Sequence, residues 1–152
     1  MRRRIFLLVI ILVVMPLILQ AQGLYRCVRV VDGDTIIVEI AGEKERVRLI
    51  GVDTPETVHP NKPVEHYGKE ASAFTKKMVD GEMVRLEYGL ESRDRYGRLL
   101  AYVFLTDGTF LNAEIIKQGY GFAYTRFPFK YMEQFRQYER EARESEIGLW
   151  AK

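Results

Sequence analysis

Acidic residues gather at two points of the chain where carboxylates could do chemistry. The first is the run Asp32-Gly33-Asp34-Thr35, and the second is Asp53-Thr54-Pro55-Glu56. Either run alone is ordinary, because Asp and Gly are common turn residues. Two such runs on neighbouring loops could together direct oxygen ligands to one hard cation such as Ca²⁺, which binds carboxylates, backbone carbonyls and water. The chain offers no comparable set of His or Cys ligands for zinc.

Two arginines could act on a phosphate group beside such a cation. Arg48 lies in a segment of alternating polar and apolar residues, which predicts that it shares one strand face with Arg46. Arg98 ends the polar run 94–98, where Gly97 permits an unusual backbone angle. A guanidinium group binds two phosphate oxygens at once and stabilises charge that develops in a transition state. These residue types allow two hypotheses: a metal-dependent phosphodiesterase, or a domain that only binds its partner.

Short apolar segments separated by turns must position these side chains. The periodicity predicts strands over 25–31, 35–40, 44–52, 83–88 and 99–105, helices over 67–79, 112–118 and 130–145, and loops over 53–66 and 90–98. The expected fold is α+β and mainly β, a five-stranded OB-type barrel with three helices packed outside it. The first two strands would form a hairpin and the third would pair with the second, which brings the two acidic runs together.

The first 23 residues look like a targeting segment rather than part of the fold. A basic cluster at residues 2–4 precedes an uncharged run from Ile5 to Leu19, and the small residues Ala21 and Gly23 follow. We expect 1–23 to be a signal peptide or an N-terminal anchor and 24–152 to be one domain. The expected location is secreted or periplasmic, or membrane-anchored and facing outside the cytoplasm.

The composition is that of a packed soluble domain, with 47% hydrophobic and 29% charged residues among 152. The formal charge of +2 depends on the three arginines at residues 2–4, and without residues 1–23 there are 20 basic and 21 acidic side chains, a net charge of −1. Overall charge therefore does not point to an anionic partner. The single cysteine, Cys27, excludes an internal disulfide, and we expect it to be a buried apolar residue of the first strand. Pairing of Cys27 with another molecule is the alternative.

Read in order, the motifs resemble the staphylococcal nuclease (thermonuclease) family from about Arg29 to Trp150, nearly the whole chain after the targeting segment. The matching strings are Val31-Asp32-Gly33-Asp34-Thr35, Arg48-Leu49-Ile50-Gly51-Val52-Asp53-Thr54-Pro55-Glu56-Thr57, Tyr67 to Met78, Asp94 to Tyr102, Gln118-Gly119 and Gly148-Leu149-Trp150. The resemblance implies a five-stranded OB-type barrel with three helices. It also implies Ca²⁺-dependent hydrolysis of single-stranded or locally opened DNA and RNA, by a monomer, to leave 3′-phosphate ends.

The resemblance also implies a role for each site residue. The implied metal ligands are the carboxylates of Asp34 and Asp53 and the backbone carbonyl of Thr54, with Asp32 in a supporting position beside them. Glu56 would position or deprotonate the attacking water. The implied phosphate and nucleotide contacts are Arg48, Arg98, Arg95, Tyr96 and Tyr124.

Two positions depart from the family pattern at the edge of the nucleotide pocket. Arg126 stands where the family has a second tyrosine, and Arg95 stands where a lysine is more familiar. His59 and His66 are expected to be surface residues rather than ligands, because the site is rich in oxygen. The alternative hypothesis remains a non-catalytic barrel that binds nucleic acid or protein, although the acidic and arginine residues implied by the resemblance are all present.

Overall fold

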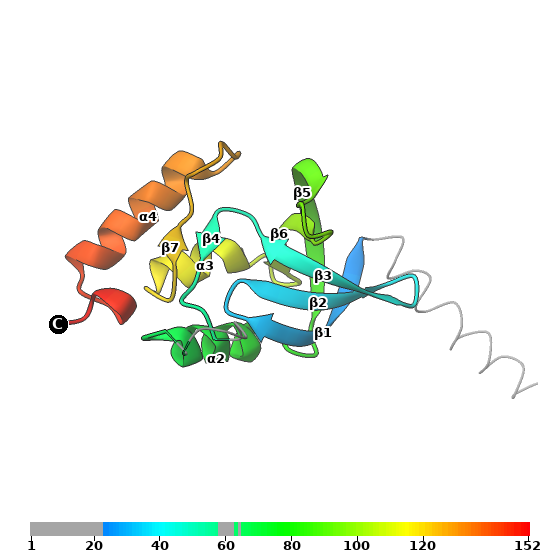
Figure 1. The fold of residues 1–152 in the computed structure, drawn as a ribbon, viewed down its shortest axis with the longest axis horizontal. Coiled ribbons are helices and arrows are strands. Elements are labelled where there is room, and N and C mark those ends of the chain that lie inside the picture. Colours follow the sequence, from blue (N-terminus) through cyan, green and yellow to red (C-terminus); the bar gives the residue numbers. More distant parts are fainter. Residues whose placement is uncertain (1–22, 58–62, 64) are drawn as a thin grey trace, which may run out of the picture.

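Five strands close into a barrel in the order β1-β2-β3-β6-β5 (Figure 1). The computed structural model describes residues 23–57, 63 and 65–152. The barrel strands are β1 (Leu24–Asp32), β2 (Thr35–Ile40), β3 (Glu43–Leu49), β5 (Met83–Arg93) and β6 (Leu99–Leu105). All neighbouring pairs are antiparallel except β3 and β6, which run parallel. The prediction of a five-stranded OB-type barrel is confirmed, together with the β1–β2 hairpin and the pairing of β2 with β3.

The barrel interior is filled by the apolar residues that alternate along each strand. On β3, Val47 and Leu49 are buried while Arg46 is exposed, as the alternation predicts. Cys27 is fully buried on β1, which confirms its prediction, and burial raises the pKa of its thiol to about 11. An inward-facing thiol of this kind behaves as a small apolar side chain.

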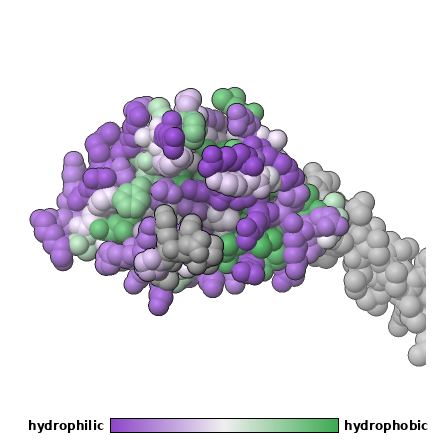
Figure 2. All heavy atoms as spheres, in the orientation of Figure 1, coloured by the Kyte–Doolittle hydropathy of each residue, from purple (hydrophilic) through white to green (hydrophobic). Residues whose placement is uncertain are grey.

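Three helices pack outside the barrel, as predicted. They are α2 (Gly68–Val79), α3 (Leu111–Lys117) and α4 (Met132–Glu144), followed by the single 3₁₀ turn η1 (Gly148–Trp150). Helix α2 packs against β1, whereas α3 lies between β6 and α4. Figure 1 shows α2 beneath the turn that joins β1 to β2, and α4 on the side away from the barrel. Most of the face seen in Figure 2 is hydrophilic, with an apolar spot over the outer end of β5.

The predicted third strand, 44–52, is wrong at its end. The chain turns at Ile50 and Gly51, and Gly51 has a φ of +74°, which disfavours any residue with a Cβ. A Cβ at Gly51 would also lie 2.5 Å from the ring of Phe129. The next two residues form β4 (Val52–Asp53), which pairs with β7 (Phe122–Ala123). Unbroken apolar residues around Gly51 conceal this turn in the sequence.

The predicted loop 90–98 is wrong at its start, because β5 continues to Arg93. The β5–β6 register shifts between Tyr88 and Arg93, and Arg93 pairs again with Leu99. An ion pair between Arg93 and Glu45, 2.8 Å long, supports this extension, on which Leu90 is fully exposed. The strand thereby carries the turn that precedes Arg98 away from the barrel wall.

The expected targeting segment lies outside the described residues, apart from Gly23. The same holds for His59, whereas His66 is described and exposed, as expected. Within the described part of the chain, none of the helices combines the length and apolar character needed to cross a membrane.

Candidate active site

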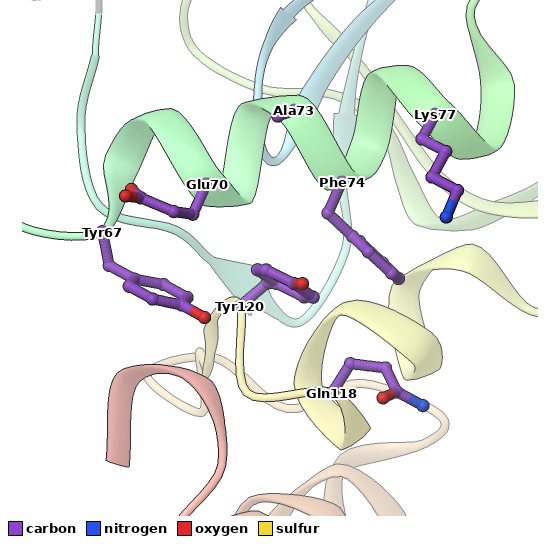
Figure 3. Close-up of a pocket in the computed structure, with 7 residues that line it drawn as sticks. All are labelled: Tyr67, Glu70, Ala73, Phe74, Lys77, Gln118 and Tyr120. Atoms are coloured by element: carbon purple, nitrogen blue, oxygen red, sulfur yellow. The ribbon is translucent and has the colours of Figure 1, made fainter. Parts of the chain in front are cut away.

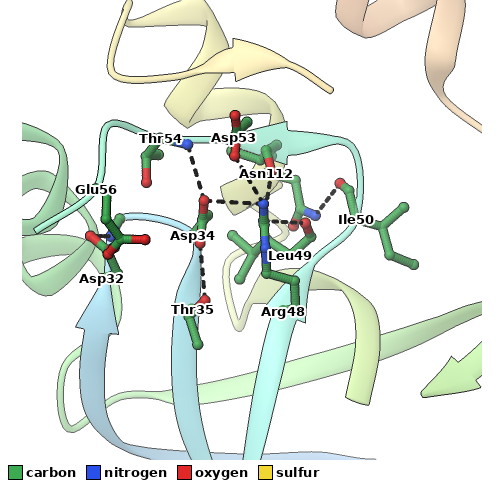
Figure 4. A network of polar contacts seen from close by, with 12 residues as sticks. Asp32, Asp34, Thr35, Arg48, Leu49, Ile50, Asp53, Thr54, Glu56 and Asn112 are labelled. Carbon is green, nitrogen blue, oxygen red and sulfur yellow. Dashed lines mark hydrogen bonds and ion pairs between the residues drawn. The ribbon is translucent and has the colours of Figure 1, made fainter. Parts of the chain in front are cut away.

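The guanidinium group of Arg48 forms ion pairs with one carboxylate from each of the two acidic runs (Figure 4). The Nη2 atom of Arg48 lies 3.2 Å from Asp34 Oδ2 and 3.2 Å from Asp53 Oδ1. Its Nη1 atom donates to the carbonyls of Leu49, at 3.1 Å, and Val52, at 2.6 Å. Arg48 therefore neutralises two carboxylates and at the same time caps the turn between β3 and β4.

Backbone pairing brings these residues together from three strands. Thr35 pairs with Arg48 across β2 and β3, so the β1–β2 turn lies beside the end of β3. The backbone amide of Leu49 donates to the carbonyl of Asp34, at 2.9 Å. The carboxylate of Asp34 accepts from the Thr35 hydroxyl, at 2.9 Å, and from the Thr54 amide, at 3.0 Å. Asp34 is thus held by both acidic runs before any ligand binds.

A second pair of acids, Asp32 and Glu56, lies beside the first. Their carboxyl groups face each other in Figure 4 and share a hydrogen bond. Asp32 also accepts hydrogen bonds from the Gly33 amide and the Thr57 hydroxyl, both at 2.8 Å. Burial and the hydrogen bond to Glu56 raise the pKa of Asp32 to about 6. The direction of this pKa shift follows from the proximity of the two acids, because two close carboxylates resist ionising together.

The Asp-Gly-Asp turn is clamped between a loop and a helix. The hydroxyl of Thr75, on α2, donates to the Gly33 carbonyl at 2.7 Å. On the other side, a Cβ at Gly33 would lie 2.7 Å from Thr54 Oγ1, so the centre of the turn has room for glycine alone. Sequence reasoning missed Thr75. Its signal was a polar residue at the spacing of the buried helix positions Ala71 and Val79.

Glu65 and Thr57 are further residues to which the sequence assigned no function. The Glu56 amide donates to the Glu65 carboxylate at 3.0 Å, and the Glu65 amide donates to the Glu56 carbonyl at 2.9 Å. Together with the contact of Thr57 to Asp32, these bonds fix the backbone on which Glu56 stands. The partners lie 9 and 25 residues away in the chain, so no local motif reveals them.

Arg98 is held by a tight turn. One oxygen of Asp94 accepts from the amides of Tyr96, at 2.9 Å, and Arg98, at 3.0 Å, and the other accepts from Arg98 Nε at 2.7 Å. Gly97 adopts a φ of +80° inside this turn. Burial opposes ionisation of Asp94, yet the hydrogen bonds from Arg98 and Tyr96 hold the pKa of Asp94 below its usual range.

The strand register brings Arg98 to the same face of the barrel as Arg48. Arg48 pairs with Leu100 across the parallel strands β3 and β6. Arg98 directly precedes β6 and is two residues before Leu100, so its side chain continues the outer face that carries Arg48. Of the two arginines that the sequence singled out, one thus lies on β3 and the other directly before the neighbouring strand β6.

Exposed aromatic and basic side chains lie beside Arg98 and in the segment after β7. Tyr96 is 68% exposed, and the guanidinium groups of Arg95 and Arg98 lie 4.7 and 5.4 Å from its ring centre. Arg95 also donates to the Tyr96 hydroxyl at 2.5 Å. Tyr124 follows β7 and is anchored by a 2.9 Å bond from its amide to the Gly51 carbonyl. Arg126 is exposed, near the ring of Phe127.

The donor set fits a hard divalent cation. Asp34 and Asp53 direct oxygens at one positively charged nitrogen, that of Arg48, which marks a position where positive charge is stabilised. Burial raises the pKa of Asp53, Arg48 opposes this, and the charges of Asp34, Glu65 and Glu56 raise it further. The buried Thr54 hydroxyl has no hydrogen-bond partner among the described residues. Those residues include no cluster of three or more His, Cys, Asp or Glu side chains that could hold a metal ion. A bound cation would therefore need carbonyl and water ligands besides the carboxylates.

A closed five-stranded barrel of this order is an OB-type barrel, and here it carries acids and arginines on one outer edge. Comparison with known proteins narrows this class. Residues 46–152 match the family described as staphylococcal nuclease homologue. The thermonuclease of Staphylococcus intermedius is 51% identical over 127 residues, covering 83% of this chain and 75% of that protein. The thermonuclease of Staphylococcus hyicus is 48% identical over 128 residues, covering 84% and 75%. Endonuclease YncB of Bacillus subtilis is 43% identical over 127 residues, covering 82% and 60%.

The chain therefore belongs to the staphylococcal nuclease family, and it is a nuclease, a hydrolase whose substrate is nucleic acid. The alternative of a non-catalytic binding barrel is set aside on this ground. Nucleases of this family are generally metal-dependent, in agreement with the oxygen-rich donor set.

Proposed function

We propose that this nuclease requires Ca²⁺ and hydrolyses single-stranded or locally opened DNA and RNA to leave 3′-phosphate ends. The observation that carries the proposal is the pair of carboxylates, Asp34 and Asp53, that shares one cationic nitrogen beside Glu56. We further propose that the enzyme works as a monomer outside the cytoplasm. Residues 1–23 would be removed as a signal peptide or kept as a membrane anchor.

The carboxylates of Asp34 and Asp53 and the backbone carbonyl of Thr54 would hold the cation. Bound there, Ca²⁺ would offset the negative charge of the phosphodiester and of its transition state. The cation would also relieve Arg48 of neutralising the two carboxylates, which frees its planar fork for phosphate oxygens. Asp32 supports this arrangement through the turn it shares with Asp34.

Glu56 would orient the attacking water and accept its proton, a contribution worth about 10²- to 10⁴-fold in rate. Arg98 would bind the phosphate through Nη1 and Nη2, because Asp94 engages its Nε. A guanidinium group is always charged, so Arg98 stabilises the developing charge and does not itself supply a proton. Arg95, Tyr96 and Tyr124 would contact the nucleotide.

Cleavage of labelled single-stranded DNA and RNA in Ca²⁺ or in a calcium chelator tests the proposal. We expect cleavage that stops in chelator, and products that a polymerase extends only after phosphatase treatment. Glu56→Gln and Arg98→Ala should each reduce the rate by at least about 10²-fold. Arg46→Ala is the matched control, because Arg46 is exposed on the outer face of the same strand as Arg48. Undiminished cleavage in chelator would overturn the metal assignment.

The location needs a separate test. The protein would be recovered from culture medium, periplasm and membranes, and its N-terminus sequenced. A new N-terminus near residue 24 supports a cleaved signal peptide, and an intact N-terminus in the membrane fraction supports the anchor. Recovery in the cytoplasm with an intact N-terminus would contradict both.

A further inference from the structure

The segment between β7 and α4 displays an aromatic ring that the fold leaves largely in solvent. Phe127, in this segment, is 63% exposed, and the nearby Tyr124 is 37% exposed. The two ring centres lie 6.4 Å apart, and the ring planes are inclined at 56°. An exposed ring contributes little to the stability of the fold, and it keeps a face free for a ligand.

The backbone of this segment is fixed at both ends, although the ring is exposed. At its start, the Tyr124 amide donates to the Gly51 carbonyl at 2.9 Å. At its end, the Lys130 amide donates to the Tyr102 hydroxyl at 3.2 Å. Phe127 therefore lies on a short loop that is held at both ends, which reduces the conformational entropy lost when a ligand binds.

The start of the segment lies directly beside the candidate active site. Strand β7 pairs with β4, the strand that carries Asp53. Tyr124 directly follows β7, and its partner Gly51 directly precedes β4. The first carbonyl of β4, that of Val52, accepts from Arg48 at 2.6 Å. Figure 1 shows the segment on the same side of the molecule as the end of β5, with the turn from β3 to β4 between them. A strand bound at Arg48 and Tyr124 can therefore continue onto this segment.

The same segment carries a positive charge beside the exposed ring. Arg126 is exposed, and its guanidinium group lies 5.7 Å from the centre of the Phe127 ring. It forms no ion pair with the residues that the structure describes. Proteins bind single-stranded nucleic acid through exposed aromatic rings, on which bases stack, and through basic groups that bind the phosphates. Phe127 and Arg126 supply one group of each kind.

A second group of aromatic rings, between α2 and the turn after α3, shows why an open ring face matters (Figure 3). There Phe74 and Tyr67 cover the two faces of Tyr120, with ring centres 4.3 and 5.6 Å from it. No face of Tyr120 is left for a base. Phe127 differs, because most of its side chain is in contact with solvent.

We propose that Phe127 and Arg126 bind the nucleotide next to the one that Tyr124 contacts, with its base stacked on Phe127 and its phosphate paired with Arg126. The proposal rests on the proposed nuclease function, because the ligand is the substrate strand. Every base has a π face, so this contact adds affinity for a longer strand without a strong preference among bases.

The test measures binding of two labelled strands to the full chain, by fluorescence anisotropy in a calcium chelator. One strand is an oligothymidine of eight nucleotides, and the other is an abasic strand of the same length, which keeps the phosphates but has no bases. We expect Phe127→Ala to weaken binding of the oligothymidine about tenfold and to leave binding of the abasic strand unchanged, because only stacking is lost. Phe127→Tyr keeps an aromatic ring and should bind both strands as the wild type does.

Arg126→Gln should affect both strands, because each carries phosphates. We expect binding of each to weaken about threefold, and the slope of log Kd against log salt concentration to fall by about 0.7, as for the loss of one phosphate contact. Leu90→Ala and Arg140→Gln are the matched controls. Leu90 is a fully exposed apolar residue of β5, and Arg140 is an exposed arginine of α4.

Equal binding of the oligothymidine by wild type and Phe127→Ala would overturn the proposal, and so would a failure of the wild type to bind this strand. An equal loss in Leu90→Ala, or a loss in Arg140→Gln that matches Arg126→Gln, would also overturn it, because a general surface effect would then explain the result. Cleavage by a wild type that fails these tests would leave the nuclease proposal standing. Base-dependent binding that is lost in Phe127→Ala supports the subsite even if cleavage does not require Ca²⁺.

Discussion

Arg48, on β3, and Arg98, directly before the neighbouring parallel strand β6, face the same side of the barrel, yet the protein holds them in different ways. The Arg48 side chain is 16% exposed and contacts two carboxylates and two backbone carbonyls, which come from the β1–β2 turn, the end of β3 and β4. The Arg98 side chain is 27% exposed and pairs with Asp94, four residues earlier in the same turn. One arginine is tied to the fold, and the other is tied to a local turn.

This difference predicts which of the two arginines contributes to stability as well as to catalysis. Asp34 is nearly buried, so removing the charge of Arg48 leaves a carboxylate with little access to solvent. Removing the charge of Arg98 disturbs a turn at the end of a protruding strand. A substitution at Arg48 should therefore affect both folding and catalysis, and one at Arg98 should affect mainly catalysis.

Arg48→Ala is expected to have the largest effect. Activity should fall by about 10²- to 10³-fold, since a charge-stabilising donor is lost. Without Ca²⁺ the unfolding free energy should fall by about 3 kcal/mol, because a mostly buried ion pair is broken. Ca²⁺ should restore part of this loss, since a cation on Asp34 and Asp53 replaces the missing charge. Urea unfolding without and with Ca²⁺ measures the stability loss and its recovery. Equal stability of variant and wild type without Ca²⁺ would contradict the link between Arg48 and the fold.

Arg98→Lys sharpens the comparison. The charge is kept but the planar fork is lost, so activity should fall by about 10²-fold. Stability should change by less than about 1 kcal/mol, because the pair with Asp94 is local and partly exposed. Arg93→Lys, in the same hairpin and paired with Glu45, is the control for a general effect of arginine loss. A large stability loss in Arg98→Lys would show that the turn is part of the cooperative fold.

The same contrast, between contacts within one short segment and contacts between distant segments, explains what the sequence could predict. The barrel followed from alternating residues such as those around Val47, whereas the candidate site residues were chosen from short strings and given their roles by the family resemblance. The turn at Gly51 was hidden, because its flanking residues are as apolar as those of a continuing strand. The two-residue strands β4 and β7 are also invisible locally, since each exists only through the other.

The supports of the site were the least predictable part. Thr75 lies 42 residues from Gly33 along the chain, and Thr57 lies 25 residues from Asp32. The Thr75 contact depends on how helix α2 packs against β1, and the Thr57 contact joins the loop after β4 to the end of β1, so the partner of neither threonine is encoded in a local motif. By contrast, the partner of Arg98 was present in its own string, because Asp94 and Arg98 belong to one turn. A contact within one turn could be predicted from the sequence, and hydrogen bonds between segments far apart in the chain could not.

Asp94→Asn tests how far that turn positions Arg98. An asparagine oxygen can still accept the amides of Tyr96 and Arg98, but its NH₂ group cannot accept from Arg98 Nε. We expect kcat to fall about tenfold and stability at pH 7 to fall by about 1 kcal/mol. The pKa of Asp94 is lowered in the folded state, so its stabilising contribution is present above the ordinary aspartate pKa and is lost as the pH falls through the lower value. Unfolding of wild type and variant should therefore converge in acid, and a constant difference at all pH values would contradict this account.

Tyr96→Phe should have the smallest effect. The hydroxyl accepts one hydrogen bond from Arg95 on an exposed surface, and such a bond contributes little in water. We expect KM for single-stranded DNA to rise about twofold with kcat unchanged, and Tyr96→Leu to raise it further because the ring near Arg98 is lost. If Tyr96→Phe instead lowered kcat as much as Arg98→Lys, the hydroxyl, Arg95 and Arg98 would have to act as one unit. Each of the two arginines, Arg48 and Arg98, would then belong to a network of several side chains, and Arg98 would not depend on its local turn alone.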